Sequence, residues 1–160
     1  MDKRQLSERD ICTKFITPAL EQAGWDIATQ VREEFPLTKG RIIVRGKLHR
    51  RGQGKRADYV LYYKPNQPIA LIEAKDQMHG LGAGMQQGLD YAETLDIPFV
   101  FSSNGDGFLF HDRTGKAATT ETELTLGGFP TPAELWQRYC AWKELTGAAV
   151  ATVETPYYDD

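Results

Sequence analysis

Apolar residues recur along the chain at two different spacings, and these spacings divide it into predicted helices and strands. Apolar side chains at near-helical intervals predict helices over residues 6–26, 84–95 and 131–145. Runs rich in β-branched and aromatic residues predict strands over residues 41–48, 57–63, 68–74, 97–103 and 108–112. The resulting order, α-β-β-β-α-β-β-α, predicts an α/β fold with a mixed β-sheet flanked by helices.

Capping and turn residues support these boundaries. Ser7 is a favourable N-cap for the first helix, and Gly24 is suited to its C-terminal end. Pro18 lies inside that helix and should kink or divide it, because proline lacks the backbone N–H. Asn104 and Gly105 tolerate the positive φ of a tight turn, so they predict a hairpin between the last two strands.

The composition fits one globular domain. The 160 residues are 41% hydrophobic and 26% charged, which is ordinary for globular proteins. No apolar stretch reaches the length of a membrane span, and the first ten residues lack the apolar core of a secretory signal. We therefore expect a soluble, cytoplasmic protein with no membrane partner. Cys12 and Cys140 lack the spacing of a zinc site and are predicted to be buried free thiols.

We predict a folded domain over residues 1–146. The tail over residues 147–160 has weak periodicity and ends in two acids, which is typical of a linker toward a downstream domain that this chain lacks.

Positive charge is concentrated in one segment of an otherwise acidic chain. Eight basic residues and no acid lie between Glu34 and Asp58, although the net charge is −3. Such a block can bind nucleic acid phosphates, because Lys and Arg contacts release counterions, or it can be a solvated loop. The predicted DNA-binding residues are Arg41, Arg45, Lys47, Arg50, Arg51, Lys55 and Arg56.

Two acids should meet where the second predicted hairpin opens. The strands on either side of residues 65–66 form this hairpin, and a symmetric antiparallel register pairs Tyr63 with Pro68 and Asp58 with Glu73. Directly opposed residues have Cβ atoms about 4.5–5.5 Å apart. Because two such carboxylates repel each other, the arrangement requires protonation, solvent or a cation, and Mg²⁺ is the usual ion for carboxylate oxygens.

Lys75 should join this pair of acids. It follows Glu73 by two residues, so a strand places both side chains on one face of the sheet. An ammonium group there can orient a metal-bound water and stabilise negative charge on a phosphate. Gln87 and Tyr91 share one helix face and could hydrogen-bond Lys75 or a phosphate. Glu8 begins the first helix, either as a favourable dipole partner or as a further metal contact.

Three ordered motifs carry a resemblance to a known family: Asp58, Glu73-Ala74-Lys75 and Gln87-Gly88-Leu89-Asp90-Tyr91. They resemble the PD-(D/E)xK nuclease superfamily, including the Gln-x-x-x-Tyr motif of its RecB-like branch. The wider match over residues 6–145 looks like the N-terminal nuclease domain of type I restriction enzyme motor (R) subunits. Ala57 stands before Asp58, where the motif often has a proline that is not a ligand.

The resemblance implies a restriction-endonuclease-like fold and Mg²⁺-dependent cleavage of double-stranded DNA, with Mn²⁺ as a substitute. It implies ATP use by translocase domains downstream, and methyltransferase and specificity subunits as partners. This chain has no G-x-x-x-x-G-K-[ST] loop of its own. The resemblance implies metal ligation by Asp58, Glu73, the Ala74 carbonyl and Glu8. It implies catalysis by Asp58, Glu73 and Lys75, and support of the site by Gln87 and Tyr91.

Three other interpretations remain open from the sequence. The glycines between Gly80 and Gly84 could form a phosphate-binding loop, although Met85 stands where G-x-G-x-x-G requires the third glycine. The domain could keep the nuclease fold and bind DNA without cleaving it. Glu73 and Lys75 could also form an ordinary surface salt bridge, which would stabilise the fold little.

Overall fold

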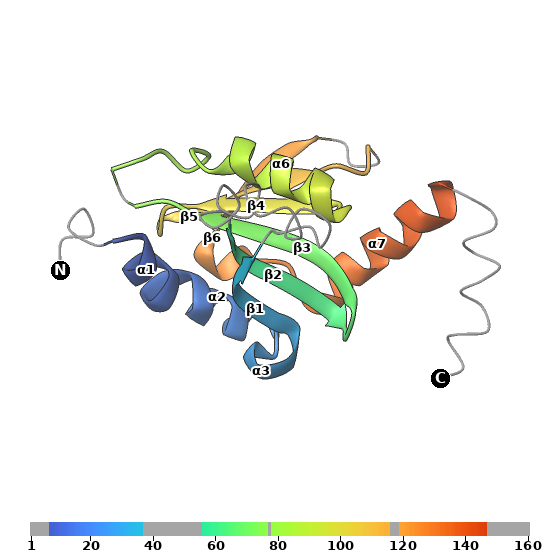
Figure 1. The fold of residues 1–160 in the computed structure, drawn as a ribbon, viewed down its shortest axis with the longest axis horizontal. Helices are drawn as coiled ribbons and strands as arrows, with labels where there is room; N and C mark the ends of the chain where they lie inside the picture. Colours follow the sequence, from blue (N-terminus) through green and yellow to red (C-terminus); the bar gives the residue numbers. More distant parts are fainter. Residues whose placement is uncertain (1–6, 37–55, 77, 116–118, 147–160) are drawn as a thin grey trace, which may run out of the picture.

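A six-stranded mixed β-sheet organises the chain in the computed structural model (Figure 1). The structure describes residues 7–36, 56–76, 78–115 and 119–146. The strands lie in the order β1-β2-β3-β4-β5-β6. Their bounds are Val31–Pro36 for β1, Arg56–Lys64 for β2, Gln67–Ala74 for β3, Phe99–Ser103 for β4, Gly107–Asp112 for β5 and Glu121–Thr125 for β6.

Only the β3–β4 pair is parallel among the described strands, and the other four pairs are antiparallel. Helix α6, Met85–Leu95, lies between β3 and β4 in the chain. A parallel pair needs such a crossover, because a tight hairpin can join only antiparallel strands. The crossover places α6 directly after the segment that leaves the end of β3.

The remaining helices come from the two ends of the chain. The first helical region consists of α1, Glu8–Ile11, the π-helical η2, Cys12–Ile16, and α2, Thr17–Gln22. A short helix, α3, Ile27–Gln30, leads into β1, and a 3₁₀ turn, η3, Leu126–Gly128, follows β6. The long helix α7 runs over Pro132–Thr146.

Apolar side chains alternate between the two faces of the central strands. On one face, Leu71 and Val100 pack in a small cluster with residues of α6 such as Ala92. On the other face, Ile72 and Phe101 belong to a larger cluster that includes residues of the N-terminal helices and α7. Figure 1 shows α6 on one side of the sheet and α1, α2 and α7 on the other. Burial on both faces explains why the central strands are nearly continuous apolar runs.

The predicted α/β fold is confirmed, and most predicted elements are present. The predicted helices over 84–95 and 131–145 correspond to α6 and α7. The predicted strand over 41–48 lies outside the described residues. The sequence missed β1 and β6, whose side chains are mostly exposed, because an exposed strand lacks the apolar alternation used to predict it.

The first helix is divided, as Pro18 predicts. Pro18 stands in the first turn of α2, directly after the wider π-helical turn of η2. There, the N–H of Thr17 donates to the carbonyl of Cys12, five residues earlier. A π-helical turn of this kind accommodates the break in the α-helical hydrogen-bond pattern. Ser7 caps the helix as predicted, and Gly24 ends it with a φ of 103°.

Among the described residues, no helix is both long enough and apolar enough to cross a membrane. Neither cysteine forms a disulfide, and Cys12 is buried as predicted, whereas Cys140 is only partly buried.

Candidate active site

The β2–β3 hairpin brings Asp58 and Glu73 together. The predicted register is confirmed at three pairs, Tyr59 with Ile72, Val60 with Leu71 and Leu61 with Ala70. Beyond these pairs, each acid accepts a hydrogen bond from the opposite strand: the N–H of Asp58 donates to Glu73 Oε2 at 3.1 Å, and the N–H of Ala74 donates to Asp58 Oδ2 at 2.7 Å. Both acids therefore lie at the same end of the hairpin.

The prediction was wrong near the turn. Pro68 pairs with Tyr62 and not with Tyr63, because the register shifts on both sides of Tyr62. Such a shift inserts an extra residue into one strand and bends it locally. The irregularity lies at the far end of the hairpin, so the register from Tyr59 to Leu61, next to Asp58, keeps its predicted form.

A cleft of about 390 Å³ opens beside the two acids. Its walls come from α1, η2, β1, β2, the end of β3 and α6. The lining residues are Glu8, Arg9, Cys12, Glu34, Arg56, Asp58, Glu73, Ala74, Lys75 and Gln87. The structure thus brings together all the predicted metal-binding and catalytic residues, the predicted DNA-binding residue Arg56, and Gln87 of α6.

Burial makes it costly for both acids to be ionised at the same time. Glu73 is only 3% exposed, and burial together with the charge of Asp58 raises the pKa of Glu73 to about 8. Burial also raises the pKa of Asp58, although the hydrogen bond from Ala74 and the charges of Arg9 and Lys75 oppose this rise. A carboxyl pair of this kind favours either a shared proton or a bound cation. The low exposure of Glu73 also excludes the surface salt bridge considered from the sequence.

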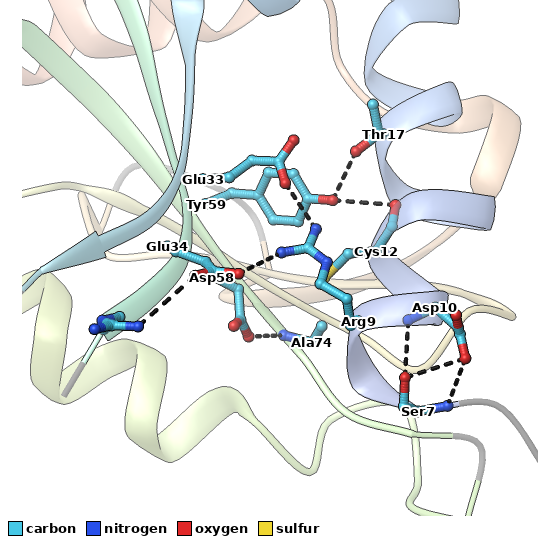
Figure 2. Close-up of polar contacts among 11 residues, drawn as sticks. Ser7, Arg9, Asp10, Cys12, Thr17, Glu33, Glu34, Asp58, Tyr59 and Ala74 are labelled. Carbon is cyan, nitrogen blue, oxygen red and sulfur yellow. Dashed lines mark hydrogen bonds and ion pairs between the residues drawn. The ribbon is translucent and has the colours of Figure 1, made fainter. Parts of the chain in front are cut away.

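Helix α1 is tied to β1 at the rim of the cleft. Figure 2 shows the guanidinium of Arg9 between Glu33 and Glu34, with distances of 2.7 Å and 2.8 Å to their carboxylates. Glu34 also lies 3.7 Å from Arg56. These ion pairs hold the start of α1, and with it Glu8, over the cleft. The negative charge of Glu8 repels the two acids and so contributes to the raised pKa values of both Asp58 and Glu73.

Gln87 and Tyr91 face the site from α6, one turn apart. Gln87 lines the cleft, and its amide donates a hydrogen bond to the hydroxyl of Tyr91. Tyr91 is 8% exposed. Burial, together with the charges of Glu73 and Asp58, raises the pKa of the Tyr91 hydroxyl, whereas the bond from Gln87 lowers it. The predicted pair is thus connected, with Gln87 in the cleft and Tyr91 behind it.

Comparison with known proteins identifies the family. Residues 27–124 match the family described as type I restriction enzyme R protein N terminus (HSDR_N). The chain belongs to this family. It is 52% identical over 156 residues to the type I restriction enzyme EcoAI endonuclease subunit of Escherichia coli, covering 97% of this chain. This chain spans only 19% of that protein's length.

A solved structure has the same fold. It is a fragment described as belonging to an HsdR subunit of a type I restriction enzyme from Vibrio vulnificus YJ016. The TM-score is 0.69 at 34% sequence identity, and the match covers 87% of this chain and 26% of that one. This likeness agrees with the predicted nuclease-like α/β architecture of the R protein N terminus.

In this R-protein domain, side chains supply only some of the ligands that a hard divalent cation needs. Among the described residues, no group of three or more His, Cys, Asp or Glu side chains is arranged to hold a metal ion. Asp58 and Glu73 supply two carboxylates, which matches the small number that Mg²⁺ uses when it retains several waters. The roles predicted for the Ala74 carbonyl and for Glu8 remain predictions.

Most of the predicted DNA-binding residues, 41 to 55, lie outside the described part of the chain. Arg56 is described, and it is exposed at the start of β2, beside the cleft. Arg9 and Glu34 also line the cleft, but the sequence did not point to them. The contacts of Arg9 join residues 24 and 25 positions apart, and no local pattern predicts such a pairing.

Three backbone N–H groups at the end of the glycine segment before α6 are already hydrogen-bonded within the chain. The N–H of Gly84 donates to Ser102 Oγ at 3.1 Å, and the N–H of Met85 donates to the carbonyl of Gly82 at 2.9 Å. The N–H of Ala83 likewise bonds Gly80. A phosphate-binding loop requires free backbone N–H groups, so these three groups do not favour the nucleotide-binding interpretation.

Proposed function

We propose that this chain is the nuclease domain of a type I restriction enzyme R subunit, and that it hydrolyses phosphodiester bonds of double-stranded DNA with the help of Mg²⁺. The observation that carries the proposal is the cleft in which buried Glu73, half-buried Asp58 and Lys75 converge. Membership of the R-protein family and the name of the EcoAI endonuclease subunit support the same activity.

Asp58 and Glu73 would hold the cation, with the Ala74 carbonyl and Glu8 as further candidate ligands. Bound Mg²⁺ would supply positive charge for the phosphoryl oxygens and lower the pKa of a water molecule. Lys75 would orient the attacking water and stabilise the charge that develops on the phosphate. The water would lose a proton as its oxygen forms a bond to phosphorus, one P–O ester bond would break, and the departing oxygen would take up a proton.

The larger assembly belongs to the same proposal. ATP-driven translocation would reside in other parts of the R subunit, and methyltransferase and specificity subunits would complete the enzyme. Recognition of a DNA sequence would then lie outside this domain, which would contact DNA through its backbone phosphates.

A thermal melt in the presence of metal tests the cation site. Saturating Mg²⁺ or Mn²⁺ should raise the melting temperature of the chain, because a ligand at about 100 times its Kd stabilises the folded state by about 2.7 kcal/mol. Asp58→Asn should remove this response. Asp26→Asn, which alters an exposed helix cap far from the cleft in sequence, is the matched control. A rise with ATP in place of the metal would contradict the proposal.

Salt dependence tests the basic segment between residues 39 and 56. Replacing its Arg and Lys residues by Gln should weaken DNA binding about equally for all DNA sequences. The dependence on log salt should also become shallower by about one unit for each phosphate that is no longer neutralised. Binding would be measured in Ca²⁺ to prevent cleavage, with Lys14→Gln, an exposed change on η2, as the control. An unchanged salt slope would show that the segment does not bind phosphates.

A further inference from the structure

Three buried polar residues stand where β4 passes into the hairpin to β5: Ser102 and Ser103 end β4, and Asn104 follows it. Ser102 and Ser103 are 0% exposed, and Asn104 is 6% exposed. A buried polar group is costly unless it is hydrogen-bonded. The partners of these side chains therefore indicate which parts of the fold they hold.

Ser102 holds the segment that follows β3. It is the direct neighbour of Glu73 in the parallel β3–β4 ladder. Its Oγ accepts a hydrogen bond from the N–H of Gly84 at 3.1 Å and donates one to the carbonyl of Leu81 at 2.9 Å. Both bonds fix the part of the chain that connects the end of β3 with α6.

Asn104 holds the same segment nearer its start. Its side-chain amide donates to the carbonyl of His79 at 2.8 Å, while its Oδ1 accepts from the N–H of Asp106 at 3.1 Å. The residue thereby connects the β4–β5 turn with the segment 78–84. Together, Ser102 and Asn104 bond this segment at three backbone groups.

The held segment packs directly on Glu73 and Lys75. A Cβ built on Gly84 would lie 3.1 Å from Glu73 Cβ and 3.6 Å from Lys75 Cγ. One turn further along α6, a Cβ on Gly88 would lie 3.4 Å from Glu73 Cγ. The backbone of this region is therefore in close contact with the stems of both side chains, and any shift in the segment would loosen their orientation.

We propose that Ser102 and Asn104 are positioning residues, which fix the segment 78–84 against β3 and so hold Glu73 and Lys75 in the orientation needed for metal binding and cleavage. This inference rests on the proposed nuclease function. Groups that orient ligands typically change metal affinity or activity by about 10- to 100-fold when they are removed, and small misplacements of reacting groups reduce rates by similar factors.

Ser103 provides a matched control on the same strand. It is as buried as Ser102, and its Oγ also makes two bonds, donating to the carbonyl of Gly107 at 2.6 Å and accepting from the N–H of Gly105 at 3.1 Å. Both partners lie at the β4–β5 turn, and neither belongs to the segment 78–84. The backbone carbonyl of Ser103 accepts a hydrogen bond from the N–H of Lys75 at 2.8 Å, and alanine keeps this bond. Ser103→Ala therefore removes an equivalent buried hydroxyl without releasing the wall of the site.

The test measures two quantities for each variant. Electron paramagnetic resonance gives the Mn²⁺ affinity of the 160-residue chain, and cleavage kinetics are measured in the assembled enzyme. Ser102→Ala should weaken Mn²⁺ binding about tenfold and lower kcat about 10- to 100-fold, with KM for DNA nearly unchanged. Ser103→Ala should lower the melting temperature similarly but leave both values within about threefold of wild type. Asn104→Ala should follow Ser102→Ala, and their double variant should lose less than the product of the single effects.

Equal losses in Ser102→Ala and Ser103→Ala would overturn the inference, because they would reflect stability alone. If Ser102→Ala does not fold, the less buried Asn104→Ala decides the question in the same comparison with Ser103→Ala. A wild-type chain that binds no Mn²⁺, in an enzyme that does not cleave, would instead refute the proposed nuclease function.

Discussion

Replacing Lys75 by alanine in the assembled enzyme is expected to abolish DNA cleavage, with a loss of at least about a hundredfold, while ATP hydrolysis and DNA association stay close to wild type. Removal of a single group that stabilises the transition state typically costs about a hundred- to a thousandfold in rate. Lys75 lines the cleft beside Glu73 and is partly exposed. Its removal should therefore not disturb the buried core.

Cleavage of plasmid DNA, ATP turnover and gel-shift binding would be measured on the same preparation. Lys64→Ala is the matched control, because Lys64 is an exposed lysine at the other end of the hairpin, with its ammonium 5.7 Å from the centre of the Trp136 ring. Persistent cutting by Lys75→Ala would show that this lysine is not catalytic. A parallel loss of ATP hydrolysis would point to a defect of the whole subunit.

The second large effect is expected at Glu73, where function and stability should change in opposite directions. Burial and the charge of Asp58 raise the pKa of Glu73 from the ordinary 4.5 to about 8. Between these two values the folded chain retains a proton that the unfolded chain releases. The free energy of unfolding of the metal-free chain should therefore fall as the pH rises from about 4.5 to about 8.

Glu73→Gln should remove this contribution to the pH dependence and stabilise the metal-free chain at pH 8, by an amount on the order of a few kcal/mol. The same variant should fail to bind Mn²⁺ and to cleave DNA, because an amide cannot supply the carboxylate charge. Urea unfolding from pH 5 to 8, with and without Mg²⁺, would measure both effects.

Glu123→Gln, an exposed change on β6, is the control for the loss of one negative charge. In wild type, Mg²⁺ should restore at pH 8 much of the stability that is lost on raising the pH, because a bound cation favours the ionised acids. If Glu73→Gln kept the pH dependence of wild type, the titrating group would be another residue.

The centre of the fold could be predicted because its strands are buried on both faces. The apolar run that precedes Glu73 can bury its side chains only between two layers. The hairpin turn at Asn66, which has a φ of 68°, sets the register. That register alone was enough to bring Asp58 and Glu73 together. The same reasoning failed beside the turn, where a bulge at Tyr62 shifts the pairing.

Other parts of the site depend on contacts that no local spacing reveals. Arg9 reaches Glu33 and Glu34 because two separate elements, α1 and β1, pack at the rim of one cleft. Ser102 looks like an ordinary strand residue until its bonds to the neighbouring segment are known. One signal was nevertheless present in the sequence: Ser102, Ser103 and Asn104 follow an apolar run, just as Glu73 and Lys75 do, and the two runs form parallel neighbours.

Strand β6, which lies at one of the two edges of the described sheet, also limits how copies of this domain can meet. Its five residues include Glu121 and Glu123, and four of the five are exposed. A second copy that paired its own β6 with this strand would bring these carboxylates close to one another, and they would repel. Charged side chains on an edge strand commonly prevent such edge-to-edge pairing. The acidic edge should thus disfavour edge-to-edge pairing between two copies of this domain.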